Sequence, residues 1–253
     1  MRKLIFTPLL AIALCGCANT PASSVDTGPQ RLRPEIVRVL PHDVTAFTEG
    51  LEFAGNTLFE GTGLEKKSIV QAGPAGEAPT VKAALAPEIF GEGITVLGPK
   101  LWQLTWRNGF AIERDTATLA ELRRVPYQGE GWGLCHQKDR LVMSNGSDTL
   151  TFRDPVTFAV TGTVRVGQNQ LNELECVGDD VYVNVWQTDR ILRFNLPTAK
   201  VTGTIDASGL LTAGERTTSD VLNGIAAVPG SDRFVLTGKL WPKMFEVRFV
   251  PNP

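Results

Sequence analysis

The sequence has few of the side chains that bind soft metals: its 253 residues include two histidines and four cysteines. Two of these cysteines fall in an N-terminal leader, so the folded part retains too few for a Cys/His zinc site. Positive charge is not in surplus either, with 25 basic against 27 acidic side chains. Without such a surplus a protein cannot neutralise a phosphate backbone, which argues against nucleic acid as a partner. The remaining composition, 42% hydrophobic and 21% charged, is that of an ordinary globular protein.

Long apolar runs are also missing. The run from Leu4 to Leu14 is too short for a transmembrane helix, which needs about 20 residues. Arg2 and Lys3 precede it, and the small-residue segment Leu14-Cys15-Gly16-Cys17 follows. These are the three regions of a secretory signal, so the chain is predicted to be exported.

The end of this leader resembles a bacterial lipobox, whose last cysteine is lipidated and becomes the first residue. We therefore predict a lipoprotein signal peptide over residues 1–16, lipidation at Cys17, and a flexible tether over residues 17–34. Cleavage without lipidation is the alternative. The alanine that follows is typical of outer-membrane lipoproteins, which predicts a periplasmic location in the bacterial cell envelope. Cys135 and Cys176 remain in an oxidising compartment, and the sequence leaves open whether they pair.

An internal repeat organises the rest of the chain. Five segments share one pattern, a polar residue and a small or acidic one followed by alternating apolar positions, and they begin at Glu49, Glu92, Glu130, Asn172 and Asn223. Their first positions lie 43, 38, 42 and 51 residues apart, close to the roughly 40–45 residues of a four-stranded propeller blade. The sequence thus predicts an all-β fold, a five-bladed β-propeller over residues 35–253.

Strand-like runs fill each period and suggest how the ring closes. Each repeat is followed by a turn and then a β-rich run, as in Val181–Trp186 after Gly178-Asp179-Asp180. Phe245–Val250 near the C-terminus and Ile36–Leu40 before the first repeat both alternate. Pairing of these terminal strands would seal the ring and remove exposed sheet edges. A double-sheet sandwich is the rival all-β architecture, but it does not explain the repeated segments.

In a propeller the first strand of each blade lines the central channel, so the five repeated residues should converge at one mouth. Four tryptophans fall in equivalent places at strand ends, namely Trp106, Trp132, Trp186 and Trp241. Indoles followed by polar residues suit the rim of a pocket. Packing inside the blades is the alternative for each of them.

These segments resemble a known family. The motifs that carry the resemblance are Phe47-Thr48-Glu49-Gly50-Leu51, Phe90-Gly91-Glu92-Gly93-Ile94-Thr95, Leu104-Thr105-Trp106, Glu130-Gly131-Trp132-Gly133-Leu134, Leu171-Asn172-Glu173-Leu174-Glu175, Asn184-Val185-Trp186, Asp220-Val221-Leu222-Asn223-Gly224-Ile225-Ala226 and Leu236-Thr237-Gly238-Lys239-Leu240-Trp241. They look like the plant-type glutaminyl cyclases (glutaminyl-peptide cyclotransferases) of plants and bacteria, a five-bladed propeller family, in family order from about Val37 to Val250. One departure is Glu49, where the family usually has glutamine.

The resemblance implies a reaction and its residues. An N-terminal glutamine is cyclised to 5-oxoproline with release of ammonia, in peptide or protein substrates. Glu92 would shuttle the proton and Lys239 would polarise the γ-carbonyl oxygen, while Asn172 would hold the carboxamide. The substrate-binding residues would be Phe47, Glu49, Trp106, Trp132 and Trp186. No metal or other cofactor is expected to take part, although a structural calcium in the channel is left open.

The sequence alone leaves two other functions open. A calcium-dependent, lactonase-like propeller hydrolase would use Glu49, Glu92, Asn172 and Asn223 as ligands, although the charge of Lys239 would oppose a cation there. A non-catalytic binding propeller of the envelope is the other alternative. In all three cases we expect a monomer that contacts the membrane only through its lipid.

Overall fold

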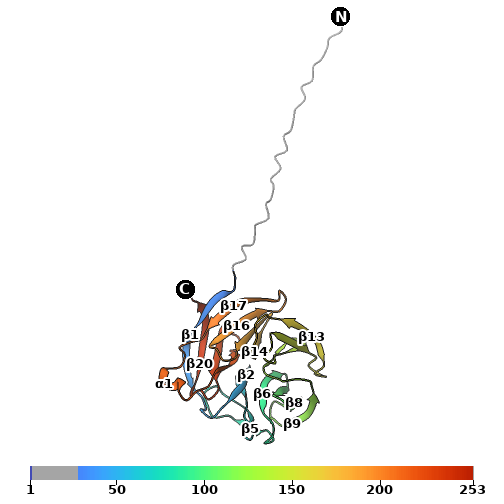
Figure 1. Ribbon diagram of the computed structural model, residues 1–253, viewed down its shortest axis with the longest axis vertical. Helices are drawn as coiled ribbons and strands as arrows, with labels where there is room; N and C mark the ends of the chain where they lie inside the picture. The colour runs from blue at the N-terminus through green and yellow to red at the C-terminus, as the bar shows by residue number, and fades with distance from the viewer. Residues whose placement is uncertain (2–27, 253) are drawn as a thin grey trace.

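The computed structural model describes Met1 and residues 28–252, which form twenty strands and one short helix (Figure 1). Four consecutive antiparallel units of four strands follow one another along the chain. They are β2 (Thr48–Ala54), β3 (Thr57–Thr62), β4 (Ile69–Gly73) and β5 (Val81–Ala84); β6 (Gly91–Leu97), β7 (Lys100–Thr105), β8 (Phe110–Asp115) and β9 (Glu121–Pro126); β10 (Leu134–Gln137), β11 (Arg140–Met143), β12 (Thr149–Arg153) and β13 (Val160–Arg165); and β14 (Leu171–Val177), β15 (Asp180–Val185), β16 (Arg190–Asn195) and β17 (Lys200–Asp206). A fifth unit contains β18 (Leu222–Ala227), β19 (Arg233–Gly238), β20 (Lys243–Pro251) and the N-terminal strand β1 (Gln30–Pro41). The fourth unit is joined through β1 to this fifth unit in one eight-stranded sheet.

The first strands of the five units form a closed inner ring. β2 contacts β6, β6 contacts β10, β10 contacts β14, β14 contacts β18, and β18 returns to contact β2. Each unit is therefore a blade whose first strand faces the axis, as the sequence predicts. The all-β propeller is confirmed, and the sandwich alternative is wrong because a sandwich has no such ring.

The ring closes through the two ends of the chain, as predicted. β1 pairs with β20 in antiparallel register, with Ile36 opposite Val247 and Val39 opposite Phe245, and the two strands lie side by side in Figure 1. β1 begins at Gln30, however, so the predicted start of the propeller at residue 35 and the predicted end of the tether at residue 34 are too late. The strand begins early because Leu32 is buried, with 3% of its surface exposed, in the same core cluster as Ile205. Leu32 also pairs with Ile205 in the parallel ladder between β1 and β17.

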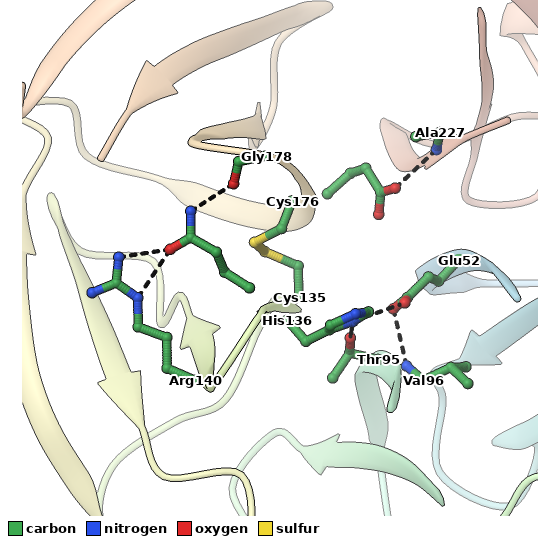
Figure 2. Close-up of a disulfide and its surroundings, with 11 residues drawn as sticks. Glu52, Thr95, Val96, Cys135, His136, Arg140, Cys176, Gly178 and Ala227 are labelled. Atoms are coloured by element: carbon green, nitrogen blue, oxygen red, sulfur yellow. Dashed lines mark hydrogen bonds and ion pairs between the residues drawn. A yellow bond between two sulfur atoms is a disulfide. The ribbon is translucent and has the colours of Figure 1, made fainter. Parts of the chain in front are cut away.

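Covalent and polar contacts join neighbouring blades along the channel. Cys135 on β10 and Cys176 on β14 form a disulfide, which answers the question that the sequence left open (Figure 2). Glu52 on β2 accepts a hydrogen bond from the Val96 amide of β6, and Glu175 accepts one from the Ala227 amide of β18. These buried carboxylates satisfy backbone donors of the next blade and so tie the inner strands together.

Two features lie outside the blades. The helix α1 (Ala213–Arg216) is a single turn in the β17–β18 connection, and a capping box between Thr212 and Glu215 begins it. Among the described residues no helix is long and apolar enough to cross a membrane. The predicted signal peptide and Cys17 lie outside the described residues.

Candidate active site

A cavity of about 350 Å³ opens at one mouth of the channel. All eight side chains predicted for the site line it, namely Phe47, Glu49, Glu92, Trp106, Trp132, Asn172, Trp186 and Lys239. Phe90, Gln187, Asp220 and Val221 complete the lining. The repeated segments therefore meet in space although they are spread over the whole chain.

A repeated local distortion points the repeated residues into this mouth. The ladders of β2, β6, β14 and β18 shift register at Glu49, Glu92, Asn172 and Asn223 respectively, which marks a β-bulge in each inner strand. A bulge gives one strand an extra residue and re-aims its side chain. The bulge residue Glu92 is followed by Gly93, where a larger residue does not fit because its Cβ would lie 2.6 Å from the Trp132 carbonyl oxygen. The polar-small pattern of the sequence is thus the signature of these bulges.

Two glutamates and a lysine form the polar end of the cavity. The Lys239 ammonium lies 2.6 Å from Glu49 Oε1, and the two side chains are 8% and 2% exposed. Asn223 donates from Nδ2 to Glu49 Oε2 at 3.2 Å and to the Thr48 carbonyl at 2.9 Å. Glu92 hydrogen-bonds to Glu49 as well. Glu49 is therefore the centre of this cluster, and Asn223 supports it from outside the cavity lining.

The protonation states of the two glutamates differ. Burial and then the negative charge of Glu49 raise the pKa of Glu92 well above its usual range, although Lys239 opposes them. Burial also raises the pKa of Glu49, but the charge and hydrogen bond of Lys239 and the hydrogen bond from Glu92 counteract it. A carboxyl pair that shares a site keeps one proton. We therefore assign the proton to Glu92 and the charge to Glu49, which Lys239 neutralises.

Aromatic side chains form the apolar walls. Phe90 packs against Phe47 with ring centres 6.2 Å apart and against Trp106 at 5.4 Å. Trp132 and Trp186 meet edge to face at 5.5 Å. The Lys239 ammonium also lies over the Phe47 ring, 4.6 Å from its centre, a favourable cation–π distance. The walls are thus continuous with the charged end.

Glu130 orders two of the indoles from outside the cavity lining. Its Oε2 accepts from Trp106 Nε1 at 2.9 Å and from Trp132 Nε1 at 3.0 Å. Arg107 pairs with Glu130 Oε1 at 2.8 Å and stacks over Trp106. Trp241 differs from the other three tryptophans at strand ends: it is fully buried in the blade core and donates to the Asp220 carbonyl. The pocket interpretation is therefore wrong for Trp241, whose ring lies in a hydrophobic cluster.

Four lining residues were not predicted from the sequence, although the sequence holds a signal for two of them. Phe90 stands two positions before Glu92, as Phe47 stands two before Glu49, and Val221 stands two before Asn223. Gln187 and Asp220 are exposed positions in connections between strands, and no spacing in the sequence distinguishes them.

The geometry does not favour a cation at this mouth. Glu49 Oε1 is occupied by an ammonium group, and the amide nitrogen of Asn223, not its oxygen, faces Glu49. Within the described part of the chain no group of three or more His, Cys, Asp or Glu side chains could hold a metal ion. Of the four ligands that the lactonase-like alternative requires, Glu49 therefore faces the Lys239 ammonium and the Asn223 amide nitrogen in this structure. The absence of a metal from the reaction stays a prediction.

Fold and site together define a five-bladed propeller with a buried acid–lysine cluster in an aromatic pocket. The model of the glutamine cyclotransferase family matches residues 8–249. The chain is 38% identical over 241 residues to the glutaminyl-peptide cyclotransferase of Arabidopsis thaliana, covering 89% of this chain and 74% of that protein. It is also similar to the crystal structure of the Myxococcus xanthus glutaminyl cyclase, with a TM-score of 0.80, 38% identity, and coverage of 89% of this chain and 100% of that one. The chain belongs to the glutamine cyclotransferase family.

Proposed function

We propose that the protein is a glutaminyl-peptide cyclotransferase, which converts an N-terminal glutamine of a peptide or protein into 5-oxoproline and releases ammonia. The observation that carries this proposal is the buried carboxyl of Glu92 beside the Glu49–Lys239 ion pair at the end of an aromatic pocket, where burial and the charge of Glu49 raise the pKa of Glu92. Family membership supports the same reaction.

Glu92 has the properties of a proton shuttle. The α-amine of the substrate attacks the side-chain amide carbon, and the carbonyl π electrons move to the oxygen. Protonated Glu92 gives its proton to the amide nitrogen through one oxygen and accepts the proton of the attacking amine through the other. The carbon–nitrogen bond then breaks, ammonia leaves, and Glu92 is again protonated. An α-amine has a pKa of about 7.7–8.0, so much of it is neutral near pH 8 and no extreme shift is required of the enzyme.

Lys239 and Asn172 are assigned to the carbonyl and carboxamide of the substrate. An ammonium has three donors, and Glu49 takes one of those of Lys239. Two remain for the developing oxyanion, whose stabilisation by a fixed charged donor lowers the barrier. The Asn172 side chain lines the same cavity, where its amide can bond the carboxamide of glutamine.

The aromatic walls are assigned to binding and to the exclusion of water. Phe47, Trp106, Trp132 and Trp186 line the cavity together, and a dry, shaped pocket favours the internal amine over water as nucleophile. Nucleophile and electrophile belong to one residue, so the protein needs only to hold its folded conformer.

The test is ammonia release from a peptide that begins with glutamine. We expect release from the purified propeller with and without a chelator, and none from the same peptide with an acetylated α-amine. A peptide that begins with asparagine is the matched control, because its cyclisation would require a four-membered ring. Failure to release ammonia from the free glutamine peptide would refute the proposal, and loss on chelation that calcium restores would favour the lactonase-like alternative.

The location in the cell is part of the proposal. The lipobox-like segment supports lipidation at Cys17 and a periplasmic protein held at the outer membrane. The disulfide between Cys135 and Cys176 supports an oxidising compartment.

A further inference from the structure

Two chain connections meet beside the pocket, and each carries one of its residues. Residues 42–47 connect β1 to β2 and end at Phe47, while residues 239–242 connect β19 to β20 and begin at Lys239. The His42 amide donates to the Pro242 carbonyl at 3.0 Å, and the Leu240 amide donates to the Ala46 carbonyl at 2.7 Å. The position of Lys239 therefore depends on the chain just before β2, where the propeller closes.

The turn that carries Lys239 is conformationally demanding. Leu240 has a φ of 60°, a left-handed value that is costly for a leucine and persists only where neighbouring contacts determine it. Gly238 has no room for a side chain, since a Cβ would lie 2.6 Å from the Val221 carbonyl oxygen. Trp241 anchors the turn by donating from Nε1 to the Asp220 carbonyl.

The ring of His42 holds the carbonyl of this turn. Its Nδ1 lies 2.8 Å from the Trp241 carbonyl oxygen and its Nε2 lies 2.9 Å from Glu60 Oε1. Because a carbonyl and a carboxylate only accept, we assign a proton to each ring nitrogen, which makes the ring an imidazolium. The Thr237 hydroxyl also lies 3.2 Å from Nδ1. The side chain is 1% exposed. Burial alone would lower the pKa of His42, but the hydrogen bond and charge of Glu60 outweigh it and raise the pKa.

Glu60 in turn is held by the first blade. Its Oε1 also accepts from the Thr48 hydroxyl at 2.7 Å, and its Oε2 accepts from Gln71 Nε2 at 2.8 Å. These contacts and His42 keep the pKa of Glu60 below its usual value despite burial. The His42–Glu60 pair therefore connects a rigid part of the first blade to the turn of the last blade.

We propose that His42, held by Glu60, is a positioning residue that fixes Lys239 through the Trp241 carbonyl. The inference rests on the proposed function, in which the Lys239 ammonium meets the substrate carbonyl. Without the donor at Nδ1 the left-handed turn relaxes and the ammonium moves relative to Glu49. A displacement of about 1 Å can lower turnover by about 100-fold.

Two conservative variants separate positioning from stability. In His42→Asn the amide nitrogen takes the place of Nδ1 and keeps the bond to the Trp241 carbonyl, whereas in His42→Gln it takes the place of Nε2 and keeps only the bond to Glu60. We expect kcat near the wild-type value for His42→Asn and a decrease of about 10- to 100-fold for His42→Gln, with KM little changed. If His42 only stabilises the fold, both variants should have wild-type kcat below their unfolding temperatures, and that result would overturn the proposal.

The second histidine provides the matched control. His136 also pairs with a glutamate, its Nδ1 lying 3.2 Å from Glu52 Oε1 (Figure 2), but neither of these two residues lines the pocket. His136→Asn should affect stability and leave kcat unchanged.

A readout independent of activity separates this inference from the proposed function. Hydrogen exchange of the Leu240 amide reports the turn directly, and it should accelerate in His42→Gln but not in His42→Asn or His136→Asn. If the wild type releases no ammonia, the proposed function fails, but hydrogen exchange of the Leu240 amide still tests whether His42 positions the turn. Unchanged exchange of this amide in a folded His42→Gln protein would overturn the positioning role of His42. If His42→Gln does not fold because Glu60 keeps a buried charge without its imidazolium partner, the double variant His42→Gln/Glu60→Gln removes that charge and still has no donor at the Nδ1 position. The Leu240 amide should exchange faster in this double variant, and unchanged exchange there would be equally decisive.

Discussion

Replacement of Glu92 by glutamine separates its role in catalysis from its role in packing. Glu92 is 5% exposed and is the protonated member of the pair with Glu49. The new amide keeps the size of the side chain and can still donate to Glu49. Folding should therefore be preserved, whereas the group that gives and accepts a proton is lost.

The expected loss follows from general acid–base catalysis, which contributes about 10²–10⁴-fold. At 1.36 kcal/mol for each factor of ten, this is about 2.7–5.4 kcal/mol of the activation barrier. The pH dependence should change as well. Because the pKa of Glu92 is raised, the protonated form is lost only as pH rises through that raised value, and the corresponding decline of kcat should disappear in Glu92→Gln.

Two measurements are needed, the rate of ammonia release and the unfolding temperature of the same preparations. A large decrease in kcat at an unchanged unfolding temperature is the expected outcome. If the residue is instead structural, the unfolding temperature should fall and activity should decrease only with the folded fraction. Full turnover in a folded Glu92→Gln protein would refute the mechanism.

Three further predictions concern the ion pair, the anchor and the channel. Glu49→Gln removes the negative charge that raises the pKa of Glu92 and the carboxylate that binds Lys239. We expect kcat to be maintained or raised and its decline at alkaline pH to move to lower pH. A pH profile with lower kcat throughout would contradict this. Cys17→Ser should release the protein from membrane fractions on immunoblots, and equal retention of the variant would disprove the anchor. Burial and the charge of Glu52 raise the pKa of Glu175 well above its ordinary value of 4.5, so stability is lost as pH rises from that value through the folded-state pKa. Glu175→Gln should lack this loss, and melting curves at pH 5 and pH 8 should show its advantage over the wild type growing with pH; an equal difference at both would count against the assignment.

The sequence by itself determined the architecture, because each blade is a local unit. Turns, alternating strands and the repeated polar-small pattern are short-range features, and a spacing near one blade length gives the number of units. The same regularity placed the site. Once every repeat begins at the inner strand, Glu49, Glu92 and Asn172 must converge on one mouth, and the lengths of the intervening strands do not matter.

Only the tertiary structure decided which of these residues contact one another. The disulfide between Cys135 and Cys176 bridges two blades, and the ion pair of Glu49 with Lys239 spans nearly the whole chain. Such contacts depend on distances of a few ångströms between distant segments, which no periodicity encodes. The protonation of Glu92 arises in the same way, since its pKa depends on burial and on charges brought from other blades. The contacts of His42 also exist only because closure of the ring brings the first and last blades together.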